Sequence, residues 1–151
     1  MKINLKLEHG FTLIELLVVI SVIGVLAGVV LFAVNPQGQI RRASDAQRKS
    51  DLRQIQSALE MYRADVGSYP DTSQLSACGG SLVNGTTTYL SKIPCDPLTH
   101  NAYSYTGIGS PATTYQIIAC LQDTTDPQKD SSNVSPCVGG TTNWSYTVKN
   151  P

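Results

Sequence analysis

The sequence predicts an α+β fold in which a long N-terminal helix packs on a small antiparallel β-sheet. Three observations support this class. An uninterrupted apolar run covers residues 11–34, a segment with helical periodicity follows it, and short β-prone stretches fill the region after Pro70. With 151 residues, the chain is long enough for one small domain in addition to the apolar run.

The apolar run at residues 11–34 is long enough to cross a membrane. A helix over this run spans roughly 36 Å, which exceeds the roughly 30 Å of a hydrocarbon core. A cleaved secretory signal would have a shorter apolar core of about 7–15 residues. The polar leader at residues 1–10 carries Lys2 and Lys6, but Arg41 and Arg42 after the run nearly offset them, so charge alone leaves the orientation open.

The four cysteines all follow the apolar run: Cys78, Cys95, Cys120 and Cys137. Their spacing is far wider than the short cysteine pairs of zinc ribbons, so we expect two disulfides. Disulfides form in oxidising compartments, which places the leader in the cytoplasm and the rest of the chain outside it. We predict the local pairs, each closing a loop of roughly 18 residues worth about 3 kcal/mol by chain entropy. The nested pairing, Cys78–Cys137 with Cys95–Cys120, stays open.

A second helix is expected after a break at residues 35–38, where Pro36 and Gly38 interrupt the pattern. Its apolar positions recur in steps of three and four and should pack on the sheet. They are Leu52, Ile55, Leu59, Tyr62 and Val66. This helix should end near Gly67, because glycine adopts the left-handed conformation that commonly closes a helix.

The rest of the chain should hold the sheet. Residues 70–89 are polar and glycine-rich and are expected to form a connecting loop, whereas strands are expected at residues 103–106, 114–121 and 144–149. The expected organisation is therefore a leader at 1–10, a membrane helix at 11–34, a break at 35–38 and an extracytoplasmic domain at 39–151.

A short motif, GFTLIE at residues 10–15, stands directly before the apolar run. It resembles the signature of type IV prepilins, which is shared by type IV pilins, type II secretion pseudopilins and competence pilins. The resemblance implies a pilin-like fold. It also implies that a membrane peptidase cleaves after Gly10 and methylates the new N-terminus at Phe11.

Glu15 is the only ionisable side chain of the apolar run. An acidic group in a membrane helix costs roughly 2.5–3.5 kcal/mol at mid-span, so a compensating partner is expected unless the side chain reaches the interface. Cleavage before Phe11 creates a cationic amine one helical turn away. The resemblance implies that the amine of a neighbouring subunit pairs with Glu15 during assembly, to which Pro36 at the helix break is also expected to contribute.

Gly24 and Gly28 form a G-x-x-x-G pair in the apolar run. Such pairs let two helices approach closely in lipid, although glycine is frequent in membrane helices generally. We expect these residues to serve helix packing.

Asp123, Asp126 and Asp130 lie in one loop among further oxygen-bearing side chains. Carboxylates are the ligands that Ca²⁺ prefers, and the resemblance implies a candidate calcium site here, because major pseudopilins bind calcium near their C-termini. The spacing does not match an EF-hand, and a solvated acidic loop is the alternative. No other cofactor is expected.

Other functions find less support. The chain balances 11 basic with 11 acidic residues, so no overall field attracts nucleic acid. The basic stretch at residues 41–53 fits either a phosphate-binding face or a solvated or intersubunit helix face. Asp96, His100 and Ser104 lie within nine positions and lack an oxyanion motif. We therefore do not expect an enzyme.

Together the motif and the apolar run indicate a structural subunit of a type IV pilus. It would be made as a single-pass membrane precursor and end in an extracellular filament. The expected partners are further copies of the chain, the prepilin peptidase and methyltransferase, the pilus assembly machinery and, before assembly, the membrane. A type II secretion pseudopilin and a DNA-uptake minor pilin are the alternatives, so nucleic acid stays open as a partner. The cysteines favour a pilin, because major pseudopilins generally lack them.

Overall fold

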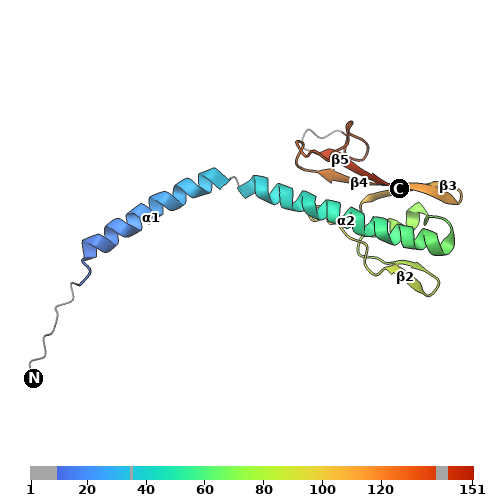
Figure 1. The fold of residues 1–151 in the computed structure, drawn as a ribbon, viewed down its shortest axis with the longest axis horizontal. Coiled ribbons are helices and arrows are strands. Elements are labelled where there is room, and N and C mark those ends of the chain that lie inside the picture. Colours follow the sequence, from blue (N-terminus) through green and yellow to red (C-terminus); the bar gives the residue numbers. More distant parts are fainter. Residues whose placement is uncertain (1–9, 35, 139–142) are drawn as a thin grey trace, which may run out of the picture. The chain divides into compact units, whose positions relative to one another are not determined.

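The computed structural model describes residues 10–34, 36–138 and 143–151, with the backbone alone at residues 31–34. The leader at residues 1–9 therefore lies outside the described residues. The chain divides into two compact units, Met1–Gly38 and Gln39–Pro151, which we describe separately. Helices precede a set of antiparallel strands (Figure 1), which confirms the predicted α+β class.

Helix α1 (Leu13–Val34) contains the apolar run. Its described side chains are exposed around the whole helix, with Leu13 at 81% and Val19 at 46%. Leu13–Val30 is long and apolar enough to cross a membrane, and it is the only such segment in the part of the chain that the structure describes. A helix that is apolar on every face requires lipid or other helices around it.

Helix α2 (Pro36–Val66) begins with a proline at its first position, where the missing N–H group has no helical partner to lose. Residues 36–38 of the break expected at 35–38 are helical, and Asn35, between the two helices, lies outside the described residues. The helix ends as predicted before Gly67, which adopts a φ of 85° and donates its N–H to the Arg63 carbonyl at 2.8 Å.

The apolar stripe of α2 forms one side of the core. Leu52, Ile55 and Leu59 are at most 2% exposed, and they share a cluster with Tyr115 and Ile117 of the sheet. The last member of the predicted stripe, Val66, is 39% exposed and stays outside this core.

The main sheet has the strand order β3–β4–β5 and is antiparallel throughout. Its strands are β3 (Ser104–Gly109), β4 (Ala112–Leu121) and β5 (Trp144–Lys149). All three lie close to the ranges expected from the sequence. In the register, Ile117 of β4 stands opposite Tyr105 of β3 and Val148 of β5. This alternation places Tyr115, Ile117 and Ala119 in the cluster that contains the apolar stripe of α2, and Leu121 is also buried.

The region at residues 70–89 is not the plain loop that the sequence predicted. It contains a short 3₁₀ helix, η1 (Thr72–Leu75), and most of a hairpin of β1 (Leu82–Asn84) with β2 (Thr87–Leu90). Gly85 opens the two-residue turn at a φ of 58°, as hairpin turns of this length require. The strands are too short to show periodicity in the sequence, and buried Leu82 and Leu90 hold the hairpin to the core.

Two disulfides are present, Cys78–Cys95 and Cys120–Cys137, with Cα–Cα distances of 5.2 and 5.5 Å. They are the local pairs expected from the sequence. The first encloses the hairpin, and the second joins the end of β4 to the segment that precedes β5.

Both outer strands of the sheet have loop groups against their free edges. At β5, Asp130 donates its N–H to the Ser145 carbonyl at 2.9 Å, and its carboxylate accepts hydrogen bonds from the N–H and Oγ1 of Thr147 at 3.1 and 2.7 Å. At β3, the N–H of Gly107 donates to Thr72 Oγ1 at 3.2 Å.

Candidate functional site

The first candidate site is the start of α1. Gly10, Phe11 and Thr12 lie outside regular structure, and Phe11 is 78% exposed. Thr12 donates to Glu15 Oε2 from its N–H at 3.0 Å and from its Oγ1 at 2.7 Å, and the Glu15 N–H returns a bond to Thr12 Oγ1 at 3.3 Å. This is a capping box, which fixes where the helix begins.

The capping box leaves the peptide bond between Gly10 and Phe11 exposed, just before the helix. Proteolysis requires a backbone segment that can enter an active site in extended form, and non-helical, exposed residues meet that requirement. Thr12 was not singled out in the sequence, although a threonine three residues before a glutamate at the head of an apolar run is the usual signal for this motif.

The two glycines of the G-x-x-x-G pair in α1 have open space beside them in the single chain. A Cβ atom added at Gly24 or Gly28 would meet no atom within 4 Å, leaving out the helix's own neighbouring backbone. Pro36 is exposed at the first position of α2. Contacts of these residues with other copies of the chain stay predictions.

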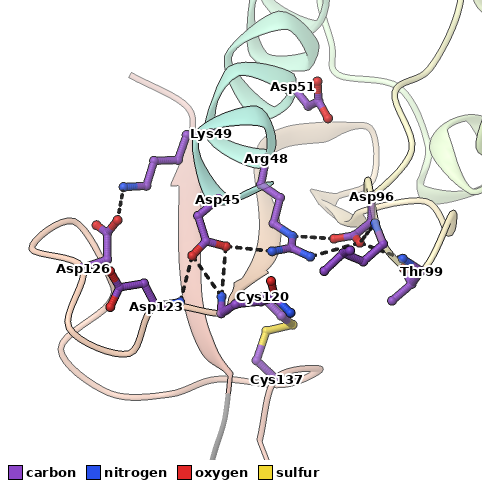
Figure 2. A network of polar contacts seen from close by, with 12 residues as sticks. Asp45, Arg48, Lys49, Asp51, Asp96, Thr99, Cys120, Asp123, Asp126 and Cys137 are labelled. Carbon is purple, nitrogen blue, oxygen red and sulfur yellow. Dashed lines mark hydrogen bonds and ion pairs between the residues drawn. A yellow bond between two sulfur atoms is a disulfide. The ribbon is translucent and has the colours of Figure 1, made fainter. Parts of the chain in front are cut away.

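The second candidate site is a buried ionic cluster of Asp45, Arg48 and Asp96 (Figure 2). Arg48 donates to Asp96 from Nε at 2.6 Å and from a terminal nitrogen at 3.1 Å, and its other terminal nitrogen donates to Asp45 at 2.7 Å. The exposed fractions are 2% for Asp45, 3% for Arg48 and 9% for Asp96. Arg48 and Asp96 lie 48 positions apart, so no local sequence pattern could have indicated their pairing.

The pKa values of Asp96 and Arg48 keep these two groups of the cluster charged. Burial alone would raise the pKa of the Asp96 carboxyl, but hydrogen bonds from Arg48, Thr99 and Leu98 outweigh it and lower that pKa to about 2. Burial would likewise lower the pKa of Arg48, and the two carboxylates reverse this and raise it. The Arg48–Asp96 ion pair therefore persists at neutral and mildly acidic pH.

The ionic cluster joins α2 to two distant loops. The Asp45 carboxylate accepts hydrogen bonds from the backbone N–H groups of Gln122, at 2.9 and 3.1 Å, and Asp123, at 2.8 Å, where the chain leaves β4. Asp96 accepts from the N–H groups of Leu98 and Thr99 in the loop after the first disulfide. The cluster is therefore a three-way connection within the second unit.

The basic stretch at residues 41–53 is largely occupied by intramolecular contacts. Arg48 is buried in the cluster, and Lys49 pairs with Asp126 at 2.5 Å. Arg42 lies 3.4 Å from Asp123. Charges already neutralised by carboxylates are poor ligands for phosphate, so the phosphate-binding interpretation loses its main residues.

The residues considered for catalysis or for metal binding do not form a catalytic or metal-binding arrangement. Asp96 is engaged by Arg48, and His100 is exposed. Over residues 10–34, 36–138 and 143–151, no group of three or more histidine, cysteine, aspartate or glutamate residues is placed to hold a metal ion. Asp123, Asp126 and Asp130 instead have separate partners.

Comparison with known proteins gives matches to both parts of the chain. The family described as "Prokaryotic N-terminal methylation motif" matches residues 5–31, and the family described as "Type II secretion system (T2SS), protein G" matches residues 35–135. No solved structure matches the chain.

Curated relatives carry the name type II secretion system core protein G. The protein of Pseudomonas aeruginosa is 34% identical over 113 residues, covering 68% of this chain and 76% of the relative. Those of Dickeya chrysanthemi and Escherichia coli K12 are each 36% identical over 101 residues, covering 60% of this chain and 63% and 66% of the relatives. The chain thus spans a little under two thirds of the length of these last two proteins.

The methylation motif covers Gly10, Phe11 and Glu15, and the protein G match covers α2 and most of the sheet. Both matches agree with a long N-terminal helix followed by a small α+β domain. The chain therefore belongs to the type II secretion system protein G family, within the wider class of pilin-like proteins.

Proposed function

We propose that the chain is a pseudopilin, a structural subunit of a type II secretion system. The observation that carries this proposal is the protein G match over residues 35–135, together with relatives that bear that name. The fully exposed apolar surface of α1 supports it, because such a helix is covered by lipid in the precursor and by α1 of other copies after assembly.

We infer that the precursor is anchored in the cytoplasmic membrane by α1, with residues 39–151 on the outer side. The two disulfides support this orientation, because they form outside the reducing cytoplasm. A secretion pseudopilin assembles in the periplasm, so this location replaces the extracellular pilus expected from the sequence. The assembly partners are further copies of the chain and the secretion machinery.

Processing should remove residues 1–10. We expect the mature protein to begin at Phe11 with a methylated amine, because the methylation motif spans this segment and the Gly10–Phe11 bond is exposed. Intact-mass analysis of protein purified from membranes would show the loss of ten residues and the gain of one methyl group. A protein that retains Gly10, or that is cut beyond α1, would contradict the prepilin interpretation.

A type IV pilus subunit is the second candidate function. The two disulfides favour it, because the resemblance stated for the sequence implies that major pseudopilins generally lack cysteines. The two candidates share the membrane precursor, the cleavage and the helical assembly. They differ in the cellular process that fails when the subunit is lost.

Deletion of the gene in the organism that makes the protein distinguishes these candidates. We expect secreted enzymes to accumulate in the periplasm and surface filaments to persist, with secretion restored by the wild-type chain. Normal secretion with loss of surface filaments would support the pilus subunit instead. Normal secretion with loss of DNA uptake would support the minor-pilin alternative.

A further inference from the structure

The loop at residues 122–130, called here the β4–β5 loop, contains the three aspartates that the family resemblance connects with calcium. Asp126 accepts hydrogen bonds from Lys49, Asp123 faces Arg42, and Asp130 accepts hydrogen bonds from the N–H and Oγ1 of Thr147. Each carboxylate thus has its own donor. The three do not converge on one point, as the ligands of one calcium ion would have to do.

Lys49 occupies the position of a cation in this loop. Its ammonium group lies 2.5 Å from Asp126 Oδ2 and 3.0 Å from Gln128 Oε1, and it stands 5.7 Å from the centre of the Tyr146 ring. The Lys49 side chain is 11% exposed and that of Asp126 is 14% exposed. A divalent cation at Asp126 would have to displace the Lys49 ammonium (Figure 2). The positive charge of this ammonium would also repel the cation.

The Arg42–Asp123 pair contributes less than the Lys49–Asp126 pair to holding the β4–β5 loop. The Arg42 side chain is 68% exposed and its nearest nitrogen is 3.4 Å away, so solvent and salt screen the interaction. Asp123 is held more firmly through its backbone, which donates to Asp45 at 2.8 Å. The β4–β5 loop is therefore fixed to α2 at two places, by Lys49 at Asp126 and by Asp45 at the start of the loop.

We propose that this subunit organises its β4–β5 loop with its own cation, Lys49, and with the Cys120–Cys137 disulfide, in place of a bound calcium ion. A lysine that is covalently part of α2 cannot be removed by a chelator. The disulfide joins the end of β4 to Cys137 and so encloses the whole β4–β5 loop. The fold of the loop then depends on the oxidation state of the compartment and does not depend on its calcium concentration, whichever filament the subunit serves.

The test measures thermal unfolding of the full chain in detergent micelles. The wild-type chain, the Lys49→Gln variant and the Lys92→Gln variant are each measured in excess EGTA and in millimolar calcium. Lys92 is exposed, so its substitution controls for the loss of one positive charge. We expect Tm to differ by less than about 1 °C between EGTA and calcium, and Lys49→Gln to lower Tm by roughly 5 °C or more in both. Lys92→Gln should leave Tm unchanged.

Two results would overturn the proposal. One is a Tm of the wild-type chain that rises by several degrees with calcium, which would show that a calcium site stabilises the fold. The other is equal Tm values for Lys49→Gln and Lys92→Gln, which would show that Lys49 does not hold the loop. If Lys49→Gln fails to fold, the wild-type calcium comparison and a Lys49→Arg variant, which keeps the charge, decide the question.

The disulfide is tested separately with a Cys120→Ser, Cys137→Ser double variant. We expect a lower Tm than that of the wild-type chain, again with no response to calcium. A gain of calcium-dependent stability in the double variant, or an unchanged Tm of that variant, would contradict the assignment of the disulfide to this role.

Discussion

Replacing Glu15 with alanine is expected to leave the precursor in the membrane and to reduce assembly by on the order of 100-fold. Membrane insertion should improve, because the substitution removes a charge from the apolar helix. Assembly should fail because the Phe11 amine of a neighbouring copy loses its partner, and an unpaired charge in an apolar interface costs about 3–5 kcal/mol. Comparison of sheared filaments with the membrane fraction measures both quantities.

Glu15→Gln separates the charge of Glu15 from its contact with Thr12. Glutamine keeps an acceptor for the Thr12 N–H and Oγ1, which bond Glu15 at 3.0 and 2.7 Å, but it carries no charge. If pairing with an amine is the role of Glu15, glutamine should be as defective as alanine, and aspartate should be intermediate. Normal assembly of Glu15→Gln would assign the residue to the capping box alone.

Replacing Arg48 with alanine is expected to destabilise the second unit by about 3–5 kcal/mol, since two buried carboxylates then lose their cation. Asp45 and Asp96 are 2% and 9% exposed, so water cannot easily take the place of the guanidinium. Because this loss is comparable to the whole stability of many domains, partial unfolding at room temperature is expected. Urea denaturation of the full chain in detergent, followed by near-ultraviolet circular dichroism, gives the free energy of unfolding.

Two further variants make the Arg48 prediction specific. Arg53→Ala removes an exposed arginine from the same helix and should change the free energy of unfolding by less than about 0.5 kcal/mol. Arg48→Ala combined with Asp96→Asn should be more stable than Arg48→Ala alone, because it removes one of the two unpaired charges. Similar unfolding curves for Arg48→Ala and Arg53→Ala would show that the ionic cluster does not stabilise the second unit.

The sequence predicts the elements that depend on repeated local signals. The run at residues 11–34 has a single charge, the stripe from Leu52 to Tyr62 keeps helical spacing over three turns, and Gly67 stands where that spacing ends. Each of these signals is carried by neighbouring residues, so one sequence is enough to detect it. These signals predict the helices, and the β-prone stretches at residues 103–106, 114–121 and 144–149 predict the strand positions, so the α+β class follows from both.

The parts that the sequence did not predict depend on distance or on very short elements. The pairing of Arg48 with Asp96 arises only when the tertiary fold brings a helix and a remote loop together. The β1–β2 hairpin has strands of three and four residues, too few for alternation to stand out. The family resemblance suggested a metal at the aspartates of the β4–β5 loop. The lysine that pairs with Asp126 was not visible from the sequence, because Lys49 lies 77 positions away in the chain.

The contacts at the edges of the sheet affect whether unassembled copies of the chain can aggregate through their strands. In the membrane precursor proposed above, exposed strand edges of neighbouring copies would pair and drive aggregation. Asp130 occupies the backbone groups of Ser145 and Thr147 at the β5 edge, and Thr72 occupies Gly107 at the β3 edge. Strand addition is thereby discouraged at both edges of the sheet, which leaves the exposed surface of α1 for the association between copies that we propose.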